Sequence, residues 1–195
     1  MNVDDVTSIT VLGAGNMGHG IAEVAALAGY DVVLRDIKDE FVRKGYDQIE
    51  WSLNKLVERD RLSQDDADAA LARVSTAVDL GEAVADADVV IEAVPEKMSI
   101  KKEVYTELEE HAPDHTVFAT NTSSLSITEL SEVTERPERF SSGMALFQPA
   151  GPHGPRRGHL RRAHRRRDAR TRRGPRRVDG QDARPRPQGQ PPASS

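Results

Sequence analysis

Short apolar runs alternate with segments of helical spacing through residues 1–149. The predicted strands are rich in β-branched and aliphatic residues and lie at 8–12, 31–36, 87–94 and 116–120, with one more beginning at Arg139. The predicted helices lie at 16–28, 98–110 and 127–133. Strands that alternate with helices predict an α/β, Rossmann-type, doubly wound and mostly parallel sheet. In such a sheet the ligand crevice lies at the carboxyl ends of the strands.

Two regions carry more detailed helix predictions. In the helix at 16–28 the apolar stripe consists of Met17, Ile21, Val24, Ala25 and Ala28. Residues 38–72 hold two helical patterns, which is more than a plain crossover needs, so we expect a helical excursion that stands away from the sheet as a cover. The first pattern is marked by Phe41, Ile49, Leu53 and Leu56. The second follows a cap-like segment that begins at Ser63.

A glycine-rich motif joins the first predicted strand to the following helix. It reads Gly13, Ala14, Gly15, Asn16, Met17, Gly18. In this G-x-G-x-x-G spacing the first glycine allows the turn, the second lets backbone amides approach a pyrophosphate, and the third lets the helix pack on the strand. Asp36 ends the next strand, where a carboxylate accepts hydrogen bonds from a ribose and repels a 2′-phosphate. The motif therefore predicts NAD rather than NADP, against a glycine-rich turn without a ligand.

Polar residues at the carboxyl ends of the strands are the other functional candidates. These candidates are Asp36, Glu96, Asn121 and Ser123. Each has a structural alternative, because Asn121 and Ser123 can cap the next helix and Glu96 can serve as a helix N-terminal charge. Ser123 has no neighbouring base in the sequence, so we expect it to bind a substrate oxygen rather than to act as a nucleophile.

Charge divides the chain into two segments. Residues 1–149 hold 13 basic and 29 acidic residues, a difference of −16, which suits a high-salt cytoplasm. Residues 150–195 hold 14 arginines and 3 aspartates, a difference of +11. The absence of cysteine excludes disulfides and thiol chemistry, and no membrane-spanning run or export signal is apparent, so we expect a cytoplasmic protein with no membrane partner and no metal.

The basic segment 150–195 consists mainly of Arg, Pro, Gly, Ala and Gln. It has almost no large apolar side chains, so we expect a disordered tail. Clustered arginines can neutralise nucleic-acid phosphates. The segment has no lysine and no interleaved aromatic residue, so nucleic acid is not the expected partner.

Three stretches resemble the NAD-binding domain of the L-3-hydroxyacyl-CoA (3-hydroxybutyryl-CoA) dehydrogenase family. They are GAGNMGHGIAEVAALAGYDVVLRD, ADVVIEAVPEKMSIKKEVYTELE and FATNTSSLSITEL. The resemblance implies NAD-dependent oxidation of the 3-hydroxyl of an acyl-CoA, in fatty acid β-oxidation or butanoate metabolism. It implies NAD contacts from the glycine motif, Asp36, Glu96, Lys101, Asn121 and Ser123. Ser123 would also contact the substrate oxygen. Ser52 and Arg59 match positions that contact coenzyme A in the family, and Lys55 is a neighbouring basic candidate. The alternative for Arg59 is a solvated charge on the helix surface.

The family's general base is a histidine after a Gly-Leu or Gly-Met pair, and Ala145 stands at that position here. The resemblance thus implies a chain without the base and without the helical domain that forms the homodimer. A shift of one nucleotide after the Met144 codon allows residues 145–158 to read HFSNPPVRMDLVEV. We therefore expect residues 150–195 to be an out-of-frame translation following a domain at 1–149. The alternative is a non-catalytic NAD-binding module with an arginine-rich interaction tail.

Overall fold

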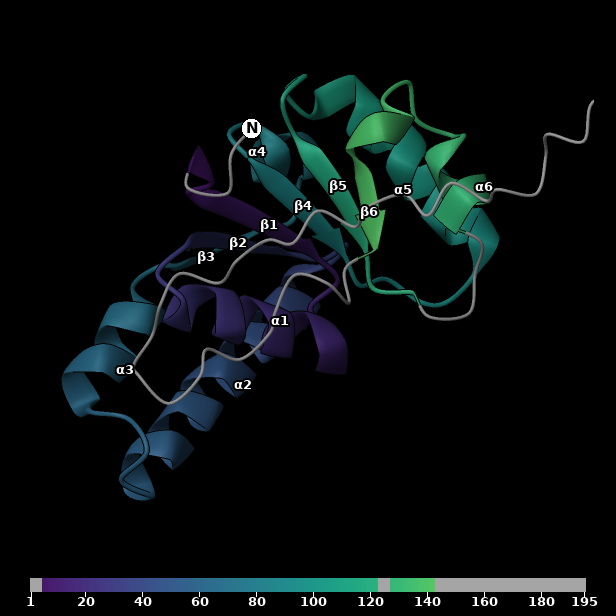
Figure 1. Cartoon of the computed structure of the whole chain (residues 1–195). Coiled ribbons are helices and arrows are strands. Elements are labelled where there is room, and N and C mark those ends of the chain that lie inside the picture. Colours follow the sequence, from purple (N-terminus) through teal and green to yellow (C-terminus); the bar gives the residue numbers. More distant parts are fainter. Residues whose placement is uncertain (1–4, 123–126, 143–195) are drawn as a thin grey trace, which may run out of the picture. The chain divides into compact units, whose positions relative to one another are not determined.

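A parallel sheet of six strands forms the centre of the computed structural model, which describes residues 5–122 and 127–142 (Figure 1). Its spatial order is β3-β2-β1-β4-β5-β6. The strands are β1 (Ser8–Leu12), β2 (Asp31–Arg35), β3 (Val74–Ala77), β4 (Val89–Glu92), β5 (Val117–Thr120) and β6 (Phe140–Ser142). Every neighbouring pair is parallel. This order has a switch point between β1 and β4, where ligands bind in doubly wound sheets.

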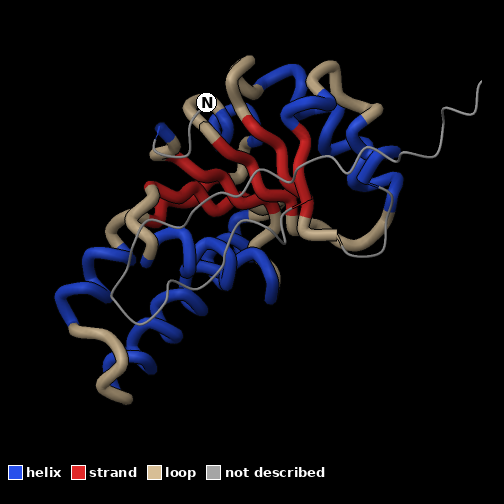
Figure 2. Tube along the Cα trace, in the orientation of Figure 1, coloured by secondary structure: helices blue, strands red, loops and turns tan. Residues whose placement is uncertain are grey.

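Helices cover both faces of the sheet. They are α1 (Asn16–Leu27), α2 (Asp39–Glu58), α3 (Gln64–Leu71), α4 (Leu80–Val84), α5 (Met98–His111) and α6 (Ile127–Ser131). The first three lie on one face and the last three on the other (Figure 1), and Figure 2 shows the strands between the two helical layers. The predicted doubly wound α/β fold is confirmed. No helix in the described ranges is long and apolar enough to cross a membrane.

Strand register brings the candidate residues to one edge. Leu12 at the end of β1 is paired with Arg35 at the end of β2 and with Glu92 at the end of β4. Glu92 is in turn paired with Thr120 at the end of β5. Because these four residues stand side by side, the segments that follow them all start at the same edge of the sheet.

The apolar core has two parts, one on each face of the sheet. On the α1–α3 face, Ile9 and Val11 of β1 pack with residues of β2 and of the three helices. On the opposite face, Leu12 packs with α4, α5 and α6. Alternation along a strand sends successive side chains to opposite faces, which explains this division.

The excursion at 38–72 packs closely against the fold rather than standing away from it. Ile49 and Leu53 of α2 and Ala67 and Ala70 of α3 belong to the same apolar cluster as α1. Ser63 caps α3 as predicted, since its Oγ accepts the Asp66 amide at 3.1 Å.

The predicted buried faces of α1 and α2 were partly wrong. In α1 the buried residues are the small ones, Gly18, Ala22, Ala25 and Ala26. Met17 is 58% exposed and Val24 46% exposed. In α2, Phe41 is 41% exposed and the buried stripe is Val42, Gly45, Ile49 and Leu53. Closely approaching helices favour small contact residues, and a pattern of large apolar positions does not reveal such a face.

Two short elements were not predicted. β3 lies at the edge of the sheet and buries only Val74 fully among its residues. α4 has five residues and is capped by Asp79, whose Oδ1 accepts the Glu82 amide at 2.8 Å. Neither segment is long enough for hydrophobic periodicity to identify it.

Candidate functional site

The glycine turn lies between the end of β1 and the start of α1. Gly13 has a positive φ of 100°, and its amide donates to the Arg35 carbonyl at 2.7 Å. A Cβ at Gly13 would lie 2.7 Å from the Ala93 carbonyl oxygen. The turn is therefore held between β2 and the segment after β4, where only glycine fits.

The other two glycines of the motif differ in their surroundings. A Cβ at Gly18 would lie 1.6 Å from the Gly13 carbonyl oxygen, so this glycine lets α1 pack on the turn. A Cβ at Gly15 would meet no other protein atom within 4 Å. Gly15 is the N-cap of α1, whose first turn contains no acidic residue. The open space at a helix N-terminus fits an anionic group such as a pyrophosphate.

The remaining residues of the motif divide between core and surface. Ala14 is buried, whereas Asn16 and Met17 are exposed beside Gly15. This end of α1 is therefore open to solvent.

Asp36 lies directly after β2 and contacts the glycine turn. Its Oδ2 accepts the Ala14 amide at 2.7 Å, and its Oδ1 accepts the Ile37 amide at 2.7 Å. A carboxylate has about four acceptor sites, so both oxygens retain capacity for hydroxyl donors. Ile37 is 65% exposed and presents an apolar side chain beside this carboxylate. The Arg35 side chain contacts the segment after β3, where its Nε donates to the Val78 carbonyl at 2.9 Å.

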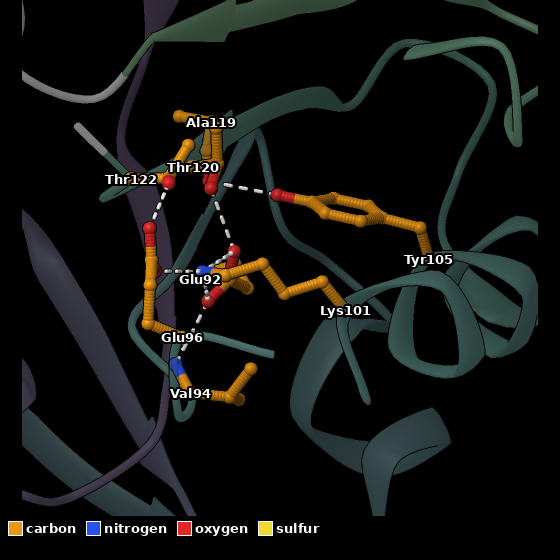
Figure 3. A network of polar contacts seen from close by, with 8 residues as sticks. All are labelled: Glu92, Val94, Glu96, Lys101, Tyr105, Ala119, Thr120 and Thr122. Atoms are coloured by element: carbon orange, nitrogen blue, oxygen red, sulfur yellow. Dashed lines mark hydrogen bonds and ion pairs between the residues drawn. The ribbon is translucent and has the colours of Figure 1, made fainter. Parts of the chain in front are cut away.

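A buried ion pair lies at the carboxyl ends of β4 and β5 (Figure 3). Lys101 of α5 is 1% exposed, and its Nζ lies 2.7 Å from Oε1 and 2.8 Å from Oε2 of Glu92, which is fully buried. Thr120 Oγ1 donates to the same carboxylate at 2.7 Å. Nearby, burial raises the pKa of the Tyr105 hydroxyl well above its ordinary value, and the charge of Glu92 adds to this effect.

Glu96 connects this ion pair to the site edge. Its Oε2 lies 3.1 Å from the Lys101 Nζ, and it accepts a short hydrogen bond from the Thr122 hydroxyl. Asn121 lies between Thr120 and Thr122, and its amide donates to the Glu92 carbonyl at 2.8 Å. The structure therefore brings together Glu96, Lys101 and Asn121, three residues that were predicted as separate candidates from the sequence.

The three expected coenzyme A contacts lie on one face of α2. Ser52, Lys55 and Arg59 are spaced three and four residues apart. Ser52 Oγ donates to Glu23 Oε1 of α1 at 2.9 Å. Lys55 pairs with Glu58 at 2.5 Å, and Arg59 is the exposed C-cap of the helix. Burial raises the pKa of Glu23 above its ordinary value, although the Ser52 hydrogen bond and the nearby His19 oppose this shift.

Sequence reasoning missed two residues that shape this site. Gly45 of α2 faces the glycine turn, because a Cβ there would lie 2.8 Å from the Ala14 Cβ and 2.9 Å from the Ala14 carbonyl oxygen. Glu92 lies inside the apolar run predicted as the strand 87–94, and no local signal identifies the partners of its carboxylate. A glycine in the middle of a helical pattern was the available signal for Gly45. The role of Glu92 could be recognised only from the fold.

Several of the predicted positions lie outside the described residues. These are Ser123, Ala145 and the segment 150–195. Among the residues that the structure describes, no group of His, Cys, Asp or Glu could hold a metal ion.

Comparison with known proteins identifies this arrangement. A family model described as 3-hydroxyacyl-CoA dehydrogenase, NAD binding domain, matches residues 8–151. The chain belongs to this family. The part of the 3-hydroxyacyl-CoA dehydrogenase fold that it carries is the NAD-binding domain, and the edge built by Gly15, Asp36 and Glu96 belongs to that domain. The resemblance predicted from the sequence is confirmed.

Individual relatives agree with this family. The mitochondrial hydroxyacyl-coenzyme A dehydrogenase of Sus scrofa is 39% identical over 149 residues, which cover 74% of this chain and 47% of that protein. The 3-hydroxyadipyl-CoA dehydrogenase of Escherichia coli is 40% identical over 146 residues, which cover 75% of this chain and 30% of that protein. This chain thus spans half or less of the length of these relatives.

Solved structures give the same result. The crystal structure of 3-hydroxybutyryl-CoA dehydrogenase from Escherichia coli matches with a TM-score of 0.68 and 40% identity, over 70% of this chain and 29% of that one. The crystal structure of (S)-3-hydroxybutyryl-CoA dehydrogenase from Ralstonia eutropha matches with a TM-score of 0.68 and 35% identity, over 70% of this chain and 48% of that one.

Proposed function

We propose that this chain binds NAD at the carboxyl edge of its sheet and that the dehydrogenase to which the domain belongs oxidises the 3-hydroxyl of an acyl-CoA. The observation that carries the proposal is the open space beside Gly15 at the N-terminus of α1, with the Asp36 carboxylate next to it. Backbone amides at a helix N-terminus bind a pyrophosphate, and a carboxylate at the end of the second strand binds a ribose. NAD supplies the hydride acceptor when it is bound.

Each residue then has a defined task. The turn from Gly13 to Gly18 binds the pyrophosphate through its backbone. Asp36 accepts the adenosine ribose hydroxyls and disfavours a 2′-phosphate, and Ile37 offers an apolar surface to the adenine ring. Glu96, Lys101, Asn121 and Ser123 serve the nicotinamide half, with Ser123 donating to the substrate oxygen. Supporting this division, Glu96, Lys101 and Asn121 lie together at the end of β4 and β5.

The acyl-CoA partner is proposed to contact α2. Ser52, Lys55 and Arg59 share one helical face, and Lys55 and Arg59 offer cations that suit the phosphates of coenzyme A. The hydrogen bond between Ser52 and Glu23 joins this face to α1, which begins at the glycine turn. The proposed coenzyme A face and the proposed pyrophosphate turn would therefore lie in the same helical layer.

The domain at 1–149 and the out-of-frame tail at 150–195 are part of the proposal. We infer that the chain binds NAD without turnover, because Ala145 stands where the resemblance requires a histidine to take the hydroxyl proton. Residues 150–195 are proposed to be an out-of-frame translation with no function of their own.

Two matched glycine variants test NAD binding. Neither Gly15 nor Gly20 has another protein atom within 4 Å of a Cβ placed on it. Gly15→Ala therefore leaves the protein packing intact but fills the space proposed for the pyrophosphate. We expect NAD affinity, measured by isothermal titration calorimetry, to fall at least about tenfold for Gly15→Ala. Gly20→Ala is expected to bind NAD within about twofold of the unsubstituted chain.

Equal affinities of the two variants would contradict the proposed pyrophosphate site, and absence of NAD binding by the unsubstituted chain would contradict the proposed function. The alternative function, an arginine-rich tail that binds nucleic acid, predicts salt-sensitive binding that disappears when residues 150–195 are removed. The family match favours the dehydrogenase.

A further inference from the structure

The buried carboxylate of Glu92 has more directed contacts than a structural ion pair requires. We propose that Glu92 is a positioning residue, which sets the place of Glu96 and of the segment 93–97 so that the site accepts NAD. This inference rests on the proposed function. Glu92 itself is fully buried, so it acts through other groups and does not touch a ligand.

Glu92 accepts donors from three separate segments (Figure 3). Its Oε1 accepts the Val94 amide at 2.8 Å and the Lys101 Nζ at 2.7 Å. Its Oε2 accepts the Lys101 Nζ at 2.8 Å and the Thr120 hydroxyl at 2.7 Å. About four acceptor sites exist on a carboxylate, so these contacts use its full capacity. One side chain therefore joins β4, β5, α5 and the segment after β4.

The contact with Val94 reaches the glycine turn. Glu92 binds the Val94 amide, and that amide nitrogen would lie 3.3 Å from a Cβ on Gly13. The neighbouring Ala93 amide donates to the Leu12 carbonyl at 2.8 Å. The segment after β4 thus forms a wall against the turn that is proposed to bind the pyrophosphate, and Glu92 fixes that wall from inside.

The contact with Lys101 reaches the other half of the site. Lys101 Nζ contacts both Glu92 and Glu96, and its distance to the Glu96 Oε2 is 3.1 Å. Glu96 is the more exposed of these two acids, with 41% of its side chain accessible. Glu96 also accepts from Thr122, two residues after Thr120. Moving Lys101 would therefore move Glu96 relative to the end of β5.

Stability alone does not account for this arrangement. Replacing a buried ion pair with neutral side chains of similar volume is often neutral or stabilising, because desolvation offsets the attraction between the charges. A hydrogen-bonded network does fix directions, and second-layer contacts of this kind orient the groups that touch a ligand. The geometry therefore points to placement rather than to stability.

A matched pair of threonine variants tests the proposal on the full 195-residue chain. Thr120 and Thr116 are both fully buried, and Thr116 Oγ1 donates to the Ala87 carbonyl at 2.7 Å at the opposite end of β5. Thr120→Val and Thr116→Val each remove a buried hydrogen bond of 2.7 Å, but only the first removes a contact of Glu92. Thr120 also hydrogen-bonds the Tyr105 hydroxyl, so Tyr105→Phe, which removes that contact and leaves the donors to Glu92 in place, is the second control and should bind NAD within about twofold of the unsubstituted chain. We expect NAD affinity, measured by calorimetry, to fall at least about threefold for Thr120→Val and to stay within about twofold for Thr116→Val.

A double variant separates placement from stability. Glu92→Gln alone leaves the Lys101 ammonium buried with Glu96 as its main counter-charge, so Glu92→Gln combined with Lys101→Met removes both buried charges together. We expect the double variant to unfold at a urea concentration at or above that of Glu92→Gln. Its NAD affinity should nevertheless stay about tenfold below that of the unsubstituted chain, as when outer-shell partners are lost at metal sites. Glu92→Gln alone keeps Lys101, which is itself proposed to serve the nicotinamide half, and it should lose NAD affinity to a similar extent, so that the loss is traced to Glu92 and not to Lys101.

Two results would overturn the proposal. The first is an equal loss of NAD affinity in Thr120→Val and Thr116→Val, and the second is unsubstituted-like NAD affinity in Glu92→Gln, which keeps Lys101. If the unsubstituted chain binds no NAD, the proposed function fails and the positioning role fails with it. If the unsubstituted chain binds NAD and either of these two results is found, the positioning role of Glu92 fails while the proposed function stands.

Discussion

The Asp36 carboxylate accepts the Ala14 amide at 2.7 Å, so the residue proposed to bind the ribose also closes the glycine turn. Asp36→Ala removes both tasks. We expect it to lower the free energy of unfolding by about 1.5–3 kcal/mol even when NAD is absent, because the hydrogen bonds from the Ala14 and Ile37 amides to a charged group are lost. Urea unfolding measures this change.

Asp36→Asn separates the two tasks of this residue. The amide oxygen can still accept the Ala14 amide, so stability should stay near that of the unsubstituted chain. The repulsion of a 2′-phosphate is removed, and the preference for NAD over NADP, compared by calorimetry, should fall about tenfold. An unchanged preference would show that Asp36 does not face the ribose.

Gly45 couples α2 to the glycine turn. A methyl group at this position would lie under 3 Å from both the Cβ and the carbonyl oxygen of Ala14. The crowding should cost about 1–3 kcal/mol of stability, which exceeds the gain of at most about 1 kcal/mol that alanine brings to a helix. We therefore expect Gly45→Ala to destabilise the chain and to weaken NAD binding.

Gly20→Ala is the matched control for this prediction, since open space surrounds that position of α1. It should stabilise the chain by about 0.5–1 kcal/mol, the helix-propensity gain alone. Thermal unfolding of the two variants in parallel gives the comparison. Stabilisation by Gly45→Ala would contradict the close contact between α2 and Ala14.

Glu23 makes stability depend on pH in a direction that can be worked out. Burial raises its pKa above the ordinary 4.5, so the folded chain holds this proton more tightly than the unfolded chain does. Stability from this group is complete below pH 4.5 and is lost as the pH rises through the raised value. Glu23→Gln removes the ionisable group, so this loss of stability at higher pH no longer occurs, and the glutamine oxygen still accepts the Ser52 hydroxyl.

We expect Glu23→Gln to raise the unfolding midpoint by about 1–3 °C at pH 7, a small gain because solvent screens this half-buried group. At pH 4 the two chains should unfold at the same temperature, because the Glu23 carboxyl is then protonated in both states. A gain of equal size at both pH values would show that the effect is not one of ionisation.

The reading frame after Met144 is open to a direct test. Sequencing the gene through the codons for Ser141 to Arg161 should show one extra nucleotide. Its removal should give the text HFSNPPVRMDLVEV from position 145. With 3-hydroxybutyryl-CoA and NAD, the 195-residue chain should form no NADH, and the chain from the corrected gene should form it. NADH formation by the uncorrected chain would contradict the need for a base at position 145.

Much of the fold follows from the sequence because its signals are local. The apolar strands β1, β2, β4 and β5 end at turn residues, and the helices between them are long enough to show a period. The glycine motif and Asp36 are close in sequence, so their spacing alone predicts a dinucleotide site. The charge difference of −16 over residues 1–149 is likewise a property of composition.

Only the tertiary structure decided which faces are buried and which distant groups meet. The buried face of α1 consists of small residues, because α2 and the sheet approach it closely. Predicting such a face requires knowing which elements pack against the helix. Gly45 meets Ala14, and Glu92 meets Lys101 and Thr120, across gaps of up to 31 residues in sequence. Such contacts depend on strand order and register, which hydrophobic periodicity does not encode, so the positioning layer behind the site appeared only in three dimensions.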